Sequence, residues 1–307
     1  EFTAETGNSY SLRIITADGK HYESDFEKMI PVPEIDSVYY HIQDEIITSE
    51  QKEYRGLSFS IDTRDETGKC EYYRWDFIED WEFAVPFPQM ADYDENRSLT
   101  YIPIENHHCW RNERSTEIKL LSTANDPQQE IKGYSIGFRT PERTNRFNIA
   151  YSILVRQYSM SERQYNFWQD MQSVNEETDD IFQKQPVSLR TNIENISDPG
   201  EKVIGFFQVS AVSEKRIFIE NNELKGKGLN FWSHNCELFI YPDDVPPDQR
   251  FRTTYEAYQF YTPQYILHNY RIQMGGIQLY FATPKCADCS TLGQTSPPIS
   301  WKNYFNK

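Results

Sequence analysis

The five cysteines are the residues of this sequence that are best suited to chemistry. Two of them, Cys286 and Cys289, form the motif CADC near its end, and the others are Cys70, Cys109 and Cys236. A structural zinc site takes four thiolate or imidazole ligands, commonly from two such pairs. Only one pair is present here. Although HHCW, which ends in Cys109 and a tryptophan, could complete a site in space, we predict no metal ligands.

The residues after CADC argue against redox chemistry. A thioredoxin-like CxxC needs a helix N-terminus to lower its thiol pKa, but Ser, Thr, Gly and two Pro follow Cys289. We therefore predict disulfides that tie the C-terminal tail to the body, with Cys236 as the preferred partner of Cys286 or Cys289. With five cysteines at least one is left over, and spacing alone does not define the pairing. The candidates are Cys109, Cys236, Cys286 and Cys289.

Acidic residues are the second candidate for chemistry. The chain has 47 Asp and Glu against 31 Lys and Arg, a net charge of −16, which disfavours a nucleic-acid partner. Asp179 with Asp180, or Asp243 with Asp244, could bind calcium or serve as the acid and base of a hydrolase. Neither pair has EF-hand spacing, so we expect solvated loop charges. No G-x-S-x-G motif is present, and we predict no cofactor.

Aromatic side chains are abundant, with 21 Tyr and 19 Phe. In YYRWDFIEDWEF, Tyr73, Trp75 and Phe77 alternate with polar residues. Exposed tryptophan faces can stack on sugar rings or anchor a protein partner, but we favour the alternative, an ordinary sandwich core. Candidates for such exposed faces are Trp75, Trp81 and Trp110.

The pattern of the chain predicts mainly β structure around these residues. Residues 10–24 suit a hairpin that turns at Asp18 and Gly19, and apolar residues recur at every second position from Phe147 to Val155. Residues 161–174 suit a helix capped by Ser161, and TTYEAYQFY suits a shorter one. No run approaches the roughly 18 apolar residues of a membrane helix. Further strands are expected at SVYYHI, GLSFSID, EYYRWDF, VIGFFQVS, KRIFIE, CELFIY and GIQLYFAT.

The N-terminal region suggests a domain boundary. Pro31 and Pro33 interrupt the strand pattern, because proline cannot donate to a β-ladder. The chain opens on EFTAETGNSYSLRI, without an initiator methionine, a signal peptide or a lipobox cysteine. We therefore expect an earlier segment that carries export and anchoring signals.

The order of several stretches resembles the DUF4249 family of Bacteroidota envelope proteins. These are SYSLRIITADGKHYESD, PVPEIDSVYY, YYRWDFIEDWEF, ILVRQYSMSERQYNFW, NIENISDPGEKVIGFFQVSAVSEKRIFI and CADCSTLGQTSPPISW. The resemblance implies an exported outer-membrane lipoprotein, encoded beside a TonB-dependent receptor. It also implies that residues 1–34 end a truncated immunoglobulin-like domain. Residues 35–307 would then form a larger β-sandwich-like domain with one or two helices packed on it. The family supplies no catalytic residues.

These observations lead to one expected function and two alternatives. We expect a non-enzymatic, surface-exposed lipoprotein that serves a TonB-dependent β-barrel transporter as a lid or capture subunit. Its membrane contact would be an N-terminal lipid anchor that this chain does not contain. The alternatives are a carbohydrate hydrolase with paired carboxylates and a cell-surface adhesion or scaffold module.

Overall fold

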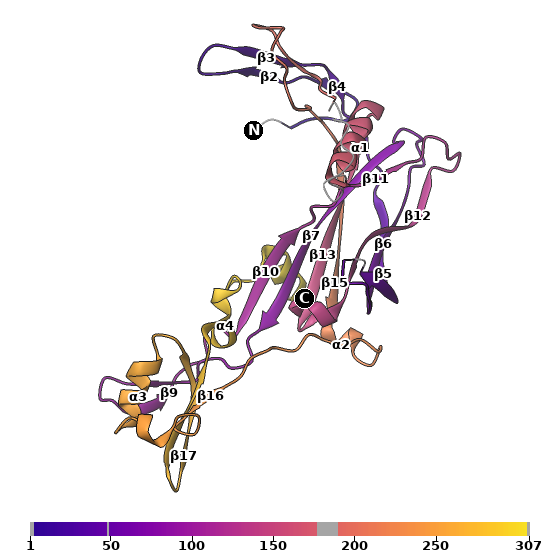
Figure 1. Ribbon diagram of the computed structural model, residues 1–307. Helices are drawn as coiled ribbons and strands as arrows, with labels where there is room; N and C mark the ends of the chain where they lie inside the picture. The colour runs from indigo at the N-terminus through magenta and orange to yellow at the C-terminus, as the bar shows by residue number, and fades with distance from the viewer. Residues whose placement is uncertain (1–2, 48, 177–189, 306–307) are drawn as a thin grey trace.

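The protein is mainly β, as the sequence predicts. The computed structural model describes residues 3–47, 49–176 and 190–305. Figure 1 shows an elongated molecule, with the N-terminal strands at one end, two large sheets in the middle and a small lobe at the other end. In the described residues, no helix is both long enough and apolar enough to span a bilayer.

The central body is a β-sandwich of two antiparallel sheets. One sheet has the order β12 (Glu130–Arg139), β6 (Lys52–Arg64) and β5 (Ile35–Ile47). The two sheets bury one shared hydrophobic core between them. The other sheet runs β10 (His108–Arg114), β7 (Tyr72–Ala84), β13 (Ala150–Ser159) and β15 (Val212–Glu220), with β11 (Lys119–Ser122) also paired to β7.

The core follows the period of two that the sequence shows. Successive side chains of a strand point to opposite faces, so every second residue enters the sandwich. The alternation expected from residue 147 begins later, because Phe147 ends the short helix η2 (Asn145–Phe147) and β13 starts at Ala150. The inward positions are Leu57, Phe59 and Ile61 of β6, Tyr73, Trp75 and Phe77 of β7, and Tyr151, Ile153 and Val155 of β13.

One carboxylate lies inside the sandwich. Glu79 of β7 is 1% exposed. Its oxygens accept hydrogen bonds from Arg139 Nε and Nη2 at 3.0 Å each and from the Tyr151 hydroxyl at 2.8 Å. Arg146 Nε lies 3.4 Å away. The buried negative charge is therefore held by two guanidinium groups and one hydroxyl.

The predicted N-terminal hairpin is confirmed. It consists of β2 (Arg13–Ile15) and β3 (His21–Ser24), while β1 (Ser9–Tyr10) pairs with β4 (Glu27–Lys28). The third strand of the hairpin's sheet, β14 (Ile193–Asn195), comes from much later in the chain. The division at residue 34 stays a prediction.

Both predicted helices are present. Ser161 Oγ accepts from the backbone N–H of Gln164 at the start of α1 (Glu162–Glu176), and α1 packs on β7 through Tyr165 and Tyr72, with ring centroids 5.1 Å apart. A Thr253–Glu256 capping box begins α3 (Thr254–Tyr261). The shorter helices are η1 (Pro141–Arg143), α2 (Asn221–Leu224), η4 (Pro247–Gln249), α4 (Pro284–Ala287), η5 (Cys289–Thr291) and α5 (Ile299–Phe305).

One predicted strand is wrong. VIGFFQVS, residues 203–210, forms no ladder. Side chains satisfy its backbone instead, since Phe207 N–H donates to Asn192 Oδ1 at 2.8 Å and the Val209 carbonyl accepts from Gln164 at 3.2 Å. CELFIY is a strand only in its second half, β16 (Phe239–Tyr241).

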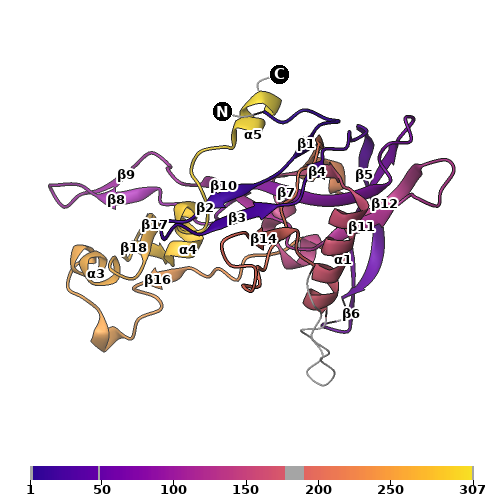
Figure 2. The same cartoon turned by 90° about the horizontal axis from the view of Figure 1, so that it is seen from above.

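The small lobe, here called the distal lobe, comprises residues 87–106 and 236–289. Its main sheet has the order β16, β18 (Gly276–Ala282) and β17 (Ile266–Gln273), and β8 (Ala91–Tyr93) pairs with β9 (Leu99–Tyr101). The lobe has its own hydrophobic core, separate from that of the sandwich. Figures 1 and 2 both place α3, which belongs to this lobe, and α1 at opposite ends of the molecule.

Candidate interaction surface

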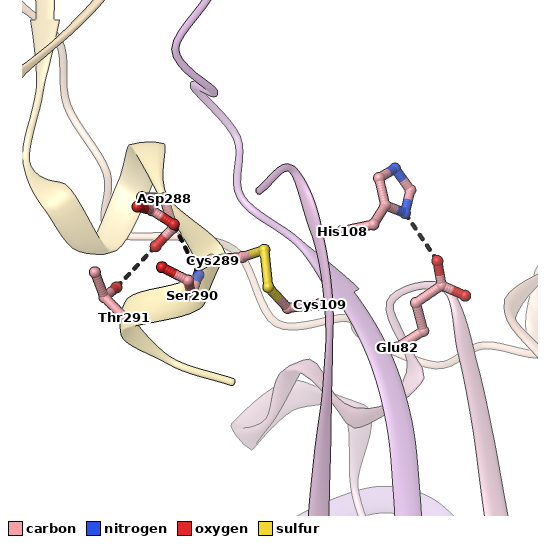
Figure 3. Close-up of a disulfide and its surroundings, with 7 residues drawn as sticks. All are labelled: Glu82, His108, Cys109, Asp288, Cys289, Ser290 and Thr291. Atoms are coloured by element: carbon pink, nitrogen blue, oxygen red, sulfur yellow. Dashed lines mark hydrogen bonds and ion pairs between the residues drawn. A yellow bond between two sulfur atoms is a disulfide. The ribbon is translucent and has the colours of Figure 1, made fainter. Parts of the chain in front are cut away.

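The two cysteines of CADC belong to two different disulfides. Cys286 of α4 is bonded to Cys236, and Cys289 of η5 is bonded to Cys109 of β10, with Cα separations of 5.9 and 5.7 Å. The disulfide prediction is therefore confirmed for all four candidates. The first bond lies within the distal lobe, whereas the second joins the lobe to the sandwich (Figure 3).

Backbone hydrogen bonds fix the CADC segment and the tail after it on both sides of this junction. The Phe87 N–H donates to the Cys286 carbonyl at 3.0 Å, and the Cys289 N–H donates to the Asn106 carbonyl at 2.9 Å. Trp110 and Gln294 exchange two bonds of 2.8 Å. Gly293 lets the tail approach this closely, because a Cβ there would lie 2.6 Å from the Trp110 carbonyl oxygen. The CADC segment thus holds the lobe against β10.

Neighbouring polar groups bond to the backbone or to one another. Asp288 Oδ1 accepts from the Ser290 N–H at 2.9 Å, which begins η5 (Figure 3). His108 points away from the disulfide and contacts Glu82 at 2.8 Å. Among the residues with described positions, no three His, Cys, Asp or Glu side chains are grouped as metal ligands.

Cys70 is the remaining cysteine and is a free, buried thiol. Burial raises its pKa to about 12, so the reactive thiolate is scarce near neutral pH. We expect a thiol reagent such as Ellman's to find no reactive thiol in the native, unreduced protein and one per chain after denaturation. Reduction before denaturation should expose all five. Two or more thiols in the denatured, unreduced protein would contradict the disulfide assignment.

Aromatic side chains fill the core of the distal lobe. The ring of Tyr261 in α3 has its centroid 4.7 Å from that of Phe239 in β16 and 5.6 Å from that of Phe281 in β18. Tyr258 of α3 donates its hydroxyl proton to Asp92 of β8 at 2.5 Å. The helix is thus packed on the sheet and also tied to the second hairpin, which makes the lobe a rigid unit.

The lobe ends in an exposed apolar hairpin tip, which we define as Ile272 and Met274. Ile272 is 71% exposed and Met274 is 110% exposed. The turn continues through Gly275 and Gly276, and an added Cβ at either glycine would have no other atom within 4 Å. Figure 1 shows the end of β17 projecting beyond the rest of the lobe. Ile272 pairs with Ile277 across the hairpin, and most of its side chain stays exposed.

Comparison with known proteins identifies the family. A family model described as "Domain of unknown function (DUF4249)" matches residues 1–216. The chain belongs to the DUF4249 family. Neither the search of curated proteins nor that of solved structures returned a match.

The DUF4249 match covers the N-terminal strands, the sandwich up to the middle of β15 and the first segment of the distal lobe. The second segment of the lobe, residues 236–289, which carries CADC and the apolar tip, lies after the matched range. The family model therefore carries no information on these two features, and their assignment rests on the geometry alone.

Two of the three tryptophans that were candidates for exposed faces are core residues. Trp75 is fully buried and donates from Nε1 to Gln157 at 2.9 Å, and Trp81 is 1% exposed and donates to Asn145 at 3.1 Å. Both occupy inward positions of β7, so the favoured interpretation as a sandwich core holds for them and they are no candidates for exposed faces. Trp110 is half-buried beside the bridge to Gln294.

The apolar tip was missed, although RIQMGGIQ combines a Gly-Gly turn with flanking apolar residues, a signal for a hairpin.

Of the two predicted acidic pairs, the structure describes only Asp243 and Asp244, and both accept hydrogen bonds within the distal lobe. Asp244 Oδ2 accepts from the Ile240 N–H at 2.6 Å and closes the turn after β16, and Asp243 accepts from Gln278. The other pair, Asp179 and Asp180, lies outside the described residues. The described pair thus shapes a loop of the distal lobe.

Proposed function

We propose that the protein is a non-enzymatic accessory subunit of a TonB-dependent outer-membrane transporter. It would act as a lid or capture subunit at the cell surface, tethered by a lipid anchor that precedes this chain. The observation that carries the proposal is the rigid distal lobe with its exposed apolar tip, in a chain whose mean hydropathy is −0.75. A large apolar side chain held out in solvent on a rigid hairpin suits a contact with another protein.

The use of the buried carboxylates also supports a binding role. Glu79 neutralises arginines inside the sandwich. Glu27 of β4 is 2% exposed and accepts from Ser161 at 3.1 Å and from Gln164 at 3.2 Å, so it joins the N-terminal sheet to the start of α1. These acids hold elements together. The β-barrel partner comes from the DUF4249 resemblance.

Isolation from native membranes tests the proposal. We expect the tagged protein, extracted from outer membranes in mild detergent, to co-purify with a β-barrel transporter in a constant molar ratio. Mass spectrometry would identify the barrel, and size-exclusion chromatography would show one shared peak. The same tag on an unrelated exported protein is the control. Recovery of the protein alone would overturn the proposal.

A further inference from the structure

A cavity of about 490 Å³, here called the lysine cavity, lies where the N-terminal strands meet the sandwich. Three parts of the chain line it: the turn before β1, the end of β4 with the residues after it, and the turn between β6 and β7. The lining residues are Thr6, Gly7, Lys28, Ile30, Pro31 and Lys69. Small-molecule sites commonly have this volume and often form at the junction between two structural units.

The charge of the lining is positive. Of the described lining residues, two are lysines and none carries a carboxylate. Lys28 and Lys69 are both exposed, and neither forms an ion pair in the described part of the chain. Other lysines do pair, since Lys20 and Lys52 each lie 2.8 Å from a glutamate oxygen. Like charges that line one cavity repel each other, and an anion between them removes this repulsion.

Acids that are close to the two lysines in sequence do not neutralise the cavity. Glu27 precedes Lys28 in β4, but its carboxylate is buried and bonded to residues at the start of α1. Successive side chains of a strand point to opposite faces, so Lys28 points away from it. Glu66 and Glu71, on either side of Lys69, do not line the cavity. The positive charge is therefore local, although the chain as a whole is acidic.

Both lysines stand on backbone that hydrogen bonds hold in place. The Lys69 N–H donates to Asp65 Oδ2 at 2.8 Å, and Asp65 is only 7% exposed. Lys28 pairs with Ser9 in the ladder of β1 and β4. A ligand therefore has to order only the two side chains, which limits the loss of conformational freedom on binding.

The other lining groups favour an organic carboxylate over a phosphate. Phosphate sites are usually built from clustered backbone N–H groups. Here the Gly7 N–H donates to the Met29 carbonyl at 2.7 Å, and the Lys69 N–H is bound within its own turn. The half-buried Ile30 and Pro31 give the cavity an apolar wall, on which the aliphatic part of a ligand can lie.

We propose that the lysine cavity binds a small organic carboxylate. The carboxylate group lies between Lys28 and Lys69, and the apolar body of the ligand lies against Ile30 and Pro31. This site goes beyond the proposed function, because it is formed by one chain and needs no barrel.

An NMR titration of the isotope-labelled whole chain with hexanoate tests the site. We expect saturable shifts at residues 28–31 and 69, with an affinity at least about tenfold higher than for acetate, because the longer chain buries more methylene groups. Lys28→Met with Lys69→Met should weaken hexanoate binding at least about fivefold. The control, Lys202→Met with Lys285→Met, removes the same charge from two exposed lysines outside the cavity and should change the affinity less than about twofold.

Two further measurements make the test specific. Lys28→Arg with Lys69→Arg keeps both charges and should bind hexanoate within about threefold of the wild type, and added salt should weaken binding. The inference is wrong if the wild type shows no saturable shifts up to about 10 mM hexanoate, or if the methionine variant of the cavity binds as well as the wild type. Preference for inorganic phosphate or for uncharged hexanol would overturn the carboxylate assignment. None of these results bears on co-purification of the barrel, so the two proposals fail separately.

Discussion

Replacing both Cys109 and Cys289 with alanine is expected to lower the free energy of unfolding by about 5 kcal/mol. The bond closes a loop of 180 residues. In the chain-entropy model, a cross-link between such distant residues removes a large part of the freedom of the unfolded chain. The same bond holds the distal lobe on β10, so its loss should also loosen the lobe before the sandwich unfolds.

Urea unfolding and limited proteolysis together check this result. The urea concentration at the midpoint of unfolding should fall strongly in the double variant. New proteolytic cuts should appear near residues 290–298, where the tail loses its attachment. Cys70→Ala is the control, since it removes a buried thiol but no cross-link and should cost about 1 kcal/mol. A double variant no less stable than this control would show that backbone hydrogen bonds and packing hold the lobe without the disulfide.

The alternation of the long strands made much of the sandwich predictable. In β6 and β7 the large apolar residues recur at every second position and fill the core between the two sheets. Burial is not confined to that face, because Ser58, Ser60 and Asp80 at alternate positions are buried as well. The helix at residues 161–174 was equally clear, since its aromatic residues recur at a helical spacing and Ser161 can cap it. The local sequence pattern was therefore enough to predict an element wherever the spacing of its apolar residues marks the face that is buried.

Other features depend on contacts between distant segments. The pairing of Cys289 with Cys109 follows from the tail lying beside β10, which spacing along the chain does not reveal. Residues 203–210 have the composition of a strand, but Asn192 and Gln164 bind their backbone in place of a neighbouring strand. The distal lobe is assembled from two segments that are 130 residues apart, so the sequence of either segment alone could not predict its surface.

Glu79 was also missed, although its position contained a signal. It follows Tyr73, Trp75 and Phe77 at the same spacing of two, so it falls on the inward face of β7. A charge at such a position needs a partner, because an unpaired buried charge is very unfavourable. The partners Arg139 and Arg146 come from β12 and η2, and no local pattern links them to Glu79.

Glu79→Gln is expected to lower the free energy of unfolding by about 3–5 kcal/mol. The substitution keeps the size of the side chain but leaves two guanidinium groups without their buried counter-ion. Burial alone would lower the pKa of Arg139, and the hydrogen bonds and charge of Glu79 outweigh it, so that this pKa is raised. Arg139 stays charged in the variant because a guanidinium keeps its proton in proteins, and its desolvation is no longer offset.

Two comparisons separate this cause from a general loss of packing. Glu113→Gln removes the other carboxylate that contacts Arg146, but the Glu113 side chain is 53% exposed, so the loss should stay below about 1 kcal/mol. Combining Glu79→Leu with Arg139→Met removes both charges of the bidentate pair and should restore at least half of the stability lost in Glu79→Gln. Chemical denaturation of the four proteins measures these differences. If the combined variant is less stable than Glu79→Gln, the carboxylate matters for its packing and hydrogen bonds with Tyr151, and not chiefly as the counter-ion of the arginines.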